Sequence, residues 1–407
     1  MTDTQQTNDD LGELVRNFNM WDTSYDANPY PVLSRLQAEC PVARSEALGG
    51  YWFVTSYEGV HDVFSNPAVF SSRNLTVPPL EEPLVLIPET IDPPEHTAYR
   101  RIFTPLFSPA RMRLLEESTR ATARSLMEAF VADGGGDFVK AVAVPLPSTV
   151  FLDLLGLPKS DLDRLLVWKD AIMRDLIADD PVKSEYAKTV MMPEFFGYFQ
   201  QSIDARRAME DPPEDVLTGM IEGELPIDGG RTMTDAEITN TLLLFVLAGL
   251  DTVTAALALS VESLATNPSL RQQLLDSPSV IPNAVEELLR YWSLVTTCRQ
   301  ANEDAVVGGQ QIKAGDYVAV CTAAASRDPL EFENPHEIDF GRTNNRHLAF
   351  GAGPHRCLGS HLARMEMAIA IEELLRVLPN FGVAPGTTPK HHFGGVLGCN
   401  ELLLVAN

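Results

Sequence analysis

The chain has 407 residues, of which 45% are hydrophobic, and a formal net charge of −25 at pH 7. This composition is typical of a globular protein that buries a sizeable core. The strong negative charge disfavours nucleic acid and anionic membranes as partners. The five cysteines are widely spaced and include no C-x-x-C pair, so the sequence indicates neither a disulfide framework nor a zinc site.

The N-terminal segment is polar and has neither a basic start nor an apolar stretch, which argues against a signal peptide. The longest apolar run, residues 242–250, is too short to cross a membrane. We therefore expect a cytoplasmic protein without a membrane segment, and a monomer. Because no linker or repeat interrupts the chain, we expect a polar tail over residues 1–20 and one domain over residues 21–407.

The first elements predicted along the chain form a small β unit. A helix over residues 28–38 precedes two strands, residues 42–46 and 51–55, which turn at Gly49-Gly50 as a hairpin. A helix over residues 56–64 follows. Residues 76–91 are rich in proline and apolar side chains, which favours either a cover over an apolar ligand or plain surface packing.

Asp92-Pro93-Pro94-Glu95-His96 then opens another helix, on which His96 and Arg100 share one face. Residues 114–201 are mainly helical, with stops at residues 134–136 and 156–158. Neither segment alone identifies a chemistry, since a histidine and an arginine on a helix face are commonly solvated.

A long helix is predicted from the capping box of Thr234 and Glu237 to about Thr266. It would span roughly 50 Å and be buried where it is apolar on nearly every side, over residues 242–250. Ala248-Gly249-Leu250-Asp251-Thr252 interrupts this apolar run. Either a packing glycine and a paired carboxylate stand here, or the helix is widened beside a proton source.

The C-terminal part begins with a helix on which Glu287 and Arg290 are spaced to pair. Strand-like runs over residues 305–312 and 317–321 follow, and residues 393–398 read as a hairpin turn. Between them, glycine-rich residues 350–359 place Cys357 just before an apolar-periodic helix. A helix mouth with Arg356 beside it should favour a thiolate. Three interpretations remain open: a metal-cofactor ligand, a nucleophile, or an inert cysteine.

Together these segments resemble the cytochrome P450 family, specifically its soluble bacterial, ferredoxin-dependent members. Residues 350–359 match the haem-binding loop, and three further motifs follow the family's order, which are Asp92 to Arg100, Ala248 to Thr252, and Glu287-x-x-Arg290. The resemblance implies a mainly α fold with small β-sheets (α+β) and a long central helix over haem b.

The resemblance also implies roles for individual residues. Cys357 would be the thiolate ligand of the haem iron, and Asp251 and Thr252 would be catalytic residues that relay protons to O2. The remaining cofactor-binding residues would be His96, Arg100, Arg299, His355, Phe350, Gly351 and Gly359. His355 can also be read as a simple turn residue. A buried structural ion network would consist of Glu287, Arg290 and Arg342.

By the same analogy the substrate pocket is apolar. Its expected lining residues are Val85, Leu86, Ile87, Leu244, Ala248, Leu294, Val295, Thr296, Val396 and Leu397. No arginine or lysine falls among them, which favours hydroxylation of a neutral terpenoid, steroid or lipid.

The expected electron donor is an acidic iron-sulfur ferredoxin with an NAD(P)H-dependent reductase. Residues 343–365 contain no acid, and Arg346, Arg356 and Arg364 within them would join Arg101, Arg111 and Arg113 in a basic face. Alternatively, these arginines bind only the haem propionates and groups in the protein interior.

Three other functions are compatible with these features. They are a peroxide-dependent haem enzyme, a haem-binding protein without turnover, and a cysteine-nucleophile hydrolase or transferase using Cys357 and His355.

Overall fold

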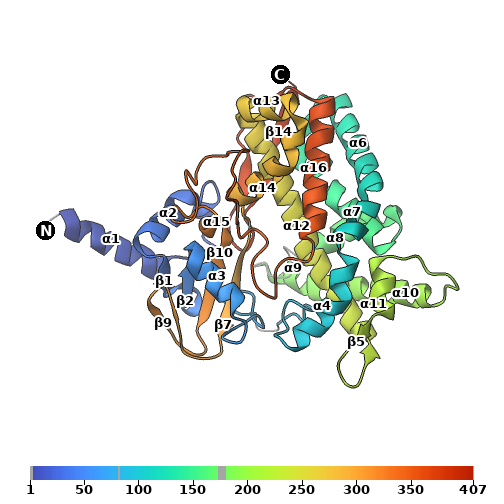
Figure 1. Cartoon of the computed structure of the whole chain (residues 1–407), viewed down its shortest axis with the longest axis horizontal. Coiled ribbons are helices and arrows are strands. Elements are labelled where there is room, and N and C mark those ends of the chain that lie inside the picture. The colour runs from blue at the N-terminus through green and yellow to red at the C-terminus, as the bar shows by residue number, and fades with distance from the viewer. Residues whose placement is uncertain (1–2, 81–82, 173–179, 407) are drawn as a thin grey trace.

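The largest sheet lies on one side of the molecule and most of the long helices lie on the other in the computed structural model, which describes residues 3–80, 83–172 and 180–406 (Figure 1). Residues 81 and 82 of the expected proline-rich cover and residues 173–179 of the expected helical region lie outside the described residues. The helices are α1 (Asp3–Asn17), α2 (Tyr30–Glu39), α3 (Tyr57–Ser65), α4 (Glu95–Leu106), α5 (Pro109–Leu114), α6 (Glu116–Ala132), α7 (Pro145–Leu155), α8 (Leu162–Asp170), α9 (Pro181–Tyr186), α10 (Met192–Arg207), α11 (Val216–Glu222), α12 (Asp235–Thr266), α13 (Pro268–Asp276), α14 (Ile281–Tyr291), α15 (Thr322–Ala325) and α16 (Ser360–Val377).

The strands are short and form several small sheets. They are β1 (Val42–Ser45), β2 (Tyr51–Val54), β3 (Phe70–Ser71), β4 (Gly136–Asp137), β5 (Glu224–Leu225), β6 (Arg231–Thr232), β7 (Thr296–Ala301), β8 (Ala305–Val307), β9 (Gln310–Ile312), β10 (Tyr317–Cys321), β11 (Phe381–Val383), β12 (Lys390–His392), β13 (Gly398–Glu401) and β14 (Leu403–Ala406). The fold is therefore mainly α with small β-sheets, as predicted.

The largest sheet has the strand order β1-β2-β10-β7-β3. The predicted hairpin of β1 and β2 is confirmed, with Val42 opposite Val54. Strand β7 was not predicted, because Thr296–Ala301 carries polar side chains where a half-buried strand usually alternates. Residues 305–312 form the hairpin of β8 and β9, which turns at Gly308 and Gly309 with φ of 53° and 79°.

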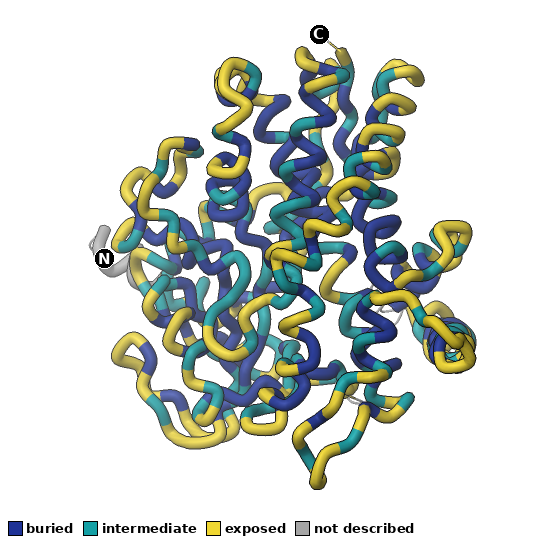
Figure 2. The backbone as a smooth tube through the Cα atoms, turned by 45° about the vertical axis from the view of Figure 1, so that its right-hand side comes forward, coloured by how far each residue is buried: buried dark blue, intermediate teal, exposed yellow. Residues whose placement is uncertain are grey.

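Helix α12 runs through the interior, with most of its residues buried, and Figure 2 shows that the backbone at the centre of the molecule is largely buried. Its predicted limits and capping box are confirmed, since the Thr234 side chain accepts from the Glu237 N–H and Glu237 reaches back. By length and composition this helix could cross a membrane, but 61% of its most apolar window is buried inside the protein. Its apolar surface is thus that of a core helix.

Two hydrophobic cores meet along α12. Leu242 to Leu250 pack in a core with α4, α7, α8, α10 and α11, whereas Val253 to Ala265 pack in a core with α6, α14 and α16. The two cores divide at residues 251 and 252, the polar pair that interrupts the apolar run. The expectation that residues 242–250 are wholly buried is wrong, because Ala248 and Gly249 are exposed to an internal cavity.

Candidate functional site

A cavity of about 1780 Å³ lies between α12, the loop of residues 350–359 and the proline-rich segment. Helix α12 contributes Leu244, Ala248, Gly249 and Thr252 to its wall, and the loop contributes Phe350 and Cys357. All five cysteines lie in the described residues, and Cys357 alone among them borders this cavity. Its exposure is therefore exposure to the cavity.

The backbone of the loop holds Cys357 in place. The Cys357 N–H donates to the Phe350 carbonyl oxygen at 2.9 Å, and the Gly359 N–H bonds the sulfur. Gly351 and Gly353 have φ of 65° and 67°, a region that other residues rarely adopt. A Cβ at Gly353 would also collide with the Phe64 carbonyl oxygen. The glycines thus fold the loop tightly against α3.

The expectation that these surroundings favour a thiolate is wrong for the protein alone. Burial raises the pKa of the Cys357 thiol above its ordinary value, and this outweighs the Gly359 N–H and the charges of Arg100 and Arg356. A thiolate here needs a further positive charge in the cavity, such as a metal ion, because a coordinated thiol loses its proton.

A cluster of basic side chains lies at one end of the cavity. Arg100, Arg299 and His355 border it, and His96 packs against His355 with ring centroids 4.1 Å apart and ring planes tilted by 43°. Both ring nitrogens of His96 are buried without a hydrogen-bond partner among the described residues. Burial, together with the charges of His355 and Arg100, lowers the pKa of His96 to about 4, so its ring is neutral at pH 7. Such a ring can donate one hydrogen bond to an anion.

Glu89 belongs to the same cluster and was missed by sequence reasoning. Its carboxylate lies 3.4 Å from the Arg299 guanidinium and 3.7 Å from the His355 ring. Burial alone would raise the Glu89 pKa, but the neighbouring His355 ring and the Arg299 charge together lower it. The proline-rich segment carries three acids, Glu81, Glu82 and Glu89, and no local pattern singles out Glu89 among them.

These features fit a flat cofactor that carries carboxylates and a metal. A Cβ built on Gly249 or on Gly359 meets no atom within 4 Å, and both glycines border the cavity. The unpartnered His96 nitrogens and the arginines suit propionate groups, and Cys357 offers a sulfur ligand. The residues present therefore fit haem, with Cys357 as the only cysteine among the described residues that borders the cavity.

The predicted proton-relay pair divides between two environments. Thr252 borders the cavity, and its hydroxyl donates to the Ala248 carbonyl oxygen at 2.7 Å, one turn back. Asp251 is not in the cavity wall. Its carboxylate accepts from Lys169 of α8 at 2.7 Å, and its side chain is 24% exposed. Thr252 therefore faces a ligand in the cavity, while Asp251 lies behind it toward solvent.

Most of the predicted pocket residues border the cavity, namely Leu86, Leu244, Ala248, Leu294, Val295, Thr296 and Val396. Three do not. Val85 is 54% exposed and points outward, whereas Ile87 and Leu397 are buried in the hydrophobic cores. The expectation of a lining without arginine or lysine is also wrong, because Arg73 and Lys188 border the cavity.

The predicted ion network is assembled and buried. Glu287 pairs with Arg290 at 2.8 Å and with Arg342 at 3.0 Å, and the exposed fractions of the Glu287 and Arg290 side chains are 1% and 0%. Arg290 also donates to the carbonyl oxygens of Ser326, Pro335 and Glu337. This network fastens α14 to residues 326–342, the stretch that leads to the cysteine loop.

Glu366 of α16 is a second residue that sequence reasoning missed. It borders the cavity, and burial raises its pKa to about 8. At neutral pH it is therefore mainly a neutral carboxylic acid, which can donate a proton into the cavity. Nothing in its sequence context distinguishes it from an exposed helix residue.

We expect Glu366→Gln to stabilise the protein increasingly as the pH rises. The native state holds the Glu366 proton up to about pH 8, whereas the unfolded state loses it near its ordinary pKa of 4.5. Native stability therefore falls across this window in the wild type only. At about pH 5 the variant and the wild type should have the same thermal midpoint. At about pH 8 the variant's midpoint should be higher, which corresponds to a gain on the order of a few kcal/mol in the free energy of unfolding. A difference that is constant with pH would contradict the assignment.

One cavity is thus bordered by a cysteine loop, a basic cluster and a long helix whose apolar run is interrupted by polar residues. These features together define a haem-thiolate protein. The family model for cytochrome P450 matches residues 278–401. The cytochrome P450 monooxygenase PikC of Streptomyces venezuelae is 34% identical over 388 residues, which is 93% of this chain and 89% of that protein. The vitamin D(3) 25-hydroxylase of Pseudonocardia autotrophica is 32% identical over 88% of both chains.

A solved structure, CYP109E1 from Bacillus megaterium in complex with testosterone, superposes with a TM-score of 0.83 at 28% identity. The match covers 93% of this chain and 99% of that one. The chain belongs to the cytochrome P450 family. It is a P450 monooxygenase with haem b as its cofactor, and bacterial members generally depend on a redox partner and act with O2 on hydrophobic substrates.

Proposed function

We propose that this enzyme inserts one oxygen atom from O2 into a neutral, steroid-sized hydrophobic substrate, as a cytoplasmic monomer. Its electrons come from NAD(P)H through a ferredoxin reductase and an acidic ferredoxin. The observation that carries the proposal is the placement of Cys357, the one cysteine of the chain in the wall of a cavity that the Ala248 to Thr252 segment also borders.

The protein's own groups have distinct tasks in this reaction. Cys357 would ligate the iron, and Arg100, Arg299, His355 and His96 would hold the propionates. When bound, the haem supplies the oxygen-activating chemistry. Thr252 offers a hydroxyl in the cavity that can exchange its bond to Ala248 for one to a ligand. Asp251, partly exposed and held by Lys169, can take a proton from solvent and pass it inward.

The cavity wall supports a bulky apolar substrate. Apart from the basic cluster at the haem end, the lining is mainly leucine, valine, phenylalanine and proline. Thr296 and Thr297 offer hydroxyls there, whereas Arg73 and Lys188 are both exposed and stand at the solvent side. Among the similar proteins, a vitamin D(3) 25-hydroxylase and a testosterone complex agree with a neutral substrate of this size.

Substrate-induced spectral titration tests this class. Testosterone and vitamin D3 should shift the ferric haem toward high spin at micromolar concentration, and monoterpenes and fatty acids should shift it less. A response confined to fatty acids would contradict a steroid-sized substrate and point to an anion contact at Lys188.

The basic face that would receive the ferredoxin is smaller than the sequence predicted. Arg346, Arg364 and Arg111 are each paired with an acid, namely Glu331, Glu286 and Glu214. Among the described residues, no ion pair engages Arg101, Arg113 or Arg356, and all three are exposed. Arg100 donates to the Arg356 carbonyl oxygen at 3.0 Å, which ties α4 to the cysteine loop. We therefore assign the docking charge to Arg101, Arg113 and Arg356.

Charge reversal at Arg101 and Arg113 should slow reduction by an acidic ferredoxin roughly 10-fold or more at low salt, and the difference should shrink as salt is added. Stopped-flow reduction measures the rate. Arg16→Glu on α1, an exposed arginine at the strand-bearing side of the molecule, is the matched control and should leave the rate unchanged (Figure 1). Equal reduction rates in the wild type, the charge-reversed variant and the Arg16→Glu control would contradict this assignment of the docking face.

Turnover under 18O2 distinguishes the proposal from its alternatives. With ferredoxin, reductase and NAD(P)H, the product should carry one labelled oxygen atom. Product formed only with added peroxide would establish the peroxide-dependent alternative. NAD(P)H consumption without any product across the steroid and terpene panel would favour a haem protein without turnover.

A further inference from the structure

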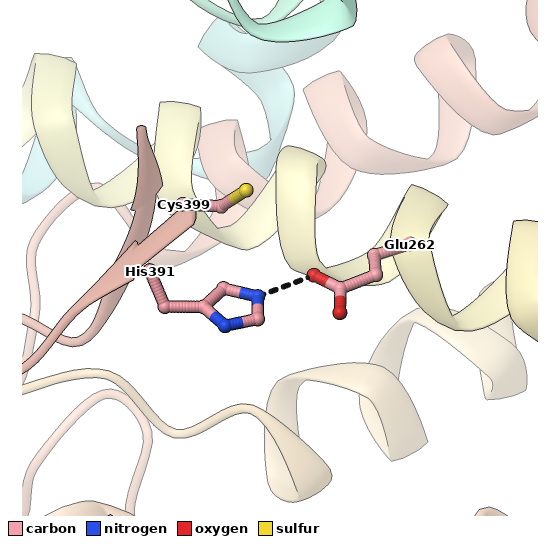
Figure 3. Close-up of side chains that lie close together, drawn as sticks. All are labelled: Glu262, His391 and Cys399. Atoms are coloured by element: carbon pink, nitrogen blue, oxygen red, sulfur yellow. Dashed lines mark hydrogen bonds and ion pairs between the residues drawn. The ribbon is translucent and has the colours of Figure 1, made fainter. Parts of the chain in front are cut away.

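Three side chains that could bind a metal ion meet away from the haem cavity. Glu262 lies near the end of α12, His391 on β12 and Cys399 on β13 (Figure 3). Their ligand atoms all lie within 4.8 Å of one another, and none of the three residues borders the large cavity. We propose that they form a Zn²⁺ site that fastens the β12–β13 hairpin to α12.

The donor set suits zinc. A cysteine sulfur, a histidine nitrogen and a carboxylate oxygen are its usual protein ligands, and three of them leave a fourth position for water. With bond lengths of about 2.0 to 2.3 Å, ligand atoms around tetrahedral Zn²⁺ lie about 3.3 to 3.8 Å apart. The His391 Nε2 and Glu262 Oε2 atoms are now 2.7 Å apart, so they must separate by less than about 1 Å.

The scaffold brings these residues together by its register. His391 and Cys399 are direct cross-strand partners in the antiparallel β12–β13 pair, so their side chains share one face of the hairpin. Strand β13 packs on α12, which presents Glu262 to that face. The register of the hairpin and the position of α12 thus bring the three side chains to the same place.

Supporting contacts orient two of the ligands. The His391 ring also bonds the backbone of Ala27, the type of contact that usually fixes a metal-bound histidine. The Cys399 thiol donates to the Glu401 carbonyl oxygen at 3.3 Å, and this hydrogen bond restricts the position of its sulfur. Zn²⁺ binding releases to solvent the thiol proton and the ring proton that His391 shares with Glu262.

The site would act on the cavity through the hairpin. Gly395 and Val396, at the tip between β12 and β13, border the cavity, and Val396 bridges to Val295. A metal ion at the base of this hairpin would hold that wall in place without touching the haem.

Zinc analysis of the purified holoenzyme tests the proposal. After dialysis from Zn²⁺-supplemented buffer, the wild type should retain one equivalent of Zn²⁺ per chain, and chelator should lower its unfolding midpoint. Cys399→Ala, which keeps the His391–Glu262 pair, should lose the metal and the chelator response. Cys40→Ala, a half-buried thiol elsewhere, should behave as the wild type.

A second variant guards against misfolding of the first. Glu262→Gln keeps the side-chain shape but removes the anionic ligand, and it should also lose Zn²⁺ while the haem spectrum stays normal. A wild type without bound zinc would overturn the site, and His391 and Glu262 would then be an ion pair beside a buried thiol. Zinc retained equally by Cys399→Ala would overturn it too.

Discussion

Glu287→Gln is expected to destabilise the protein by about 3 to 5 kcal/mol. The substitution leaves the guanidinium groups of Arg290 and Arg342 without their shared carboxylate, and Arg290 is fully buried. Because a buried charge without a partner keeps its full desolvation cost, this effect should exceed that of a typical surface substitution. Chemical unfolding followed by circular dichroism measures it, and haem retention should fall in parallel.

Glu128→Gln is the matched control for this substitution. Glu128 pairs with Arg376 at 2.8 Å, but the side chains are 54% and 44% exposed. Solvent screens such a pair, so we expect a loss of no more than about 1 kcal/mol. Similar losses for the two variants would mean that the Glu287 network carries no special share of the stability.

Cys357→Ser is expected to abolish monooxygenase turnover while the fold is retained. Serine has nearly the shape of cysteine, and Cys357 is exposed to the cavity and belongs to none of the hydrophobic core clusters. A neutral hydroxyl does not replace a thiolate as an iron ligand. Product analysis with the full electron-transfer chain, beside Cys40→Ser as the control, measures the loss. Turnover within about 10-fold of the wild type would remove Cys357 from the chemistry.

Local signals predicted α12 and the cysteine loop well. The capping box at Thr234 and the stop at Asn267 fix the helix ends through contacts within a few residues. The loop's glycines are likewise determined locally, because a positive φ restricts the residue type. These features need no knowledge of distant segments.

Features that depend on distant contacts were missed or misplaced. Glu89 gains meaning only beside Arg299 and His355, which are over 200 positions away in the chain, and Cys399 only beside Glu262 and His391. Val85, Ile87 and Leu397 were assigned to the pocket by position in a segment, but alternate residues of an extended chain face opposite ways. The sequence could not separate the unpaired arginines of the basic face from the paired ones, because the acids that pair with Arg111 and Arg364 lie far away in the chain.

The effect of burial on the protonation of a side chain could not be predicted from the sequence either. A thiol beside arginines predicts a thiolate, yet the deep position of Cys357 outweighs those charges. Glu366 is a parallel case, since burial alone raises its pKa and keeps its proton at neutral pH. Both depend on depth within the fold, which residue spacing does not report.

The reduced CO spectrum of the wild type, Cys357→Ser and Cys399→Ser tests the central claim most directly. The wild type and Cys399→Ser should both show the strongly red-shifted Soret band of a thiolate-ligated haem, because Cys357 is the one cysteine of the five that borders the cavity. Cys357→Ser should bind haem without that band. Survival of the band in Cys357→Ser, or its loss in Cys399→Ser with haem still bound, would contradict the assignment of Cys357 as the haem ligand.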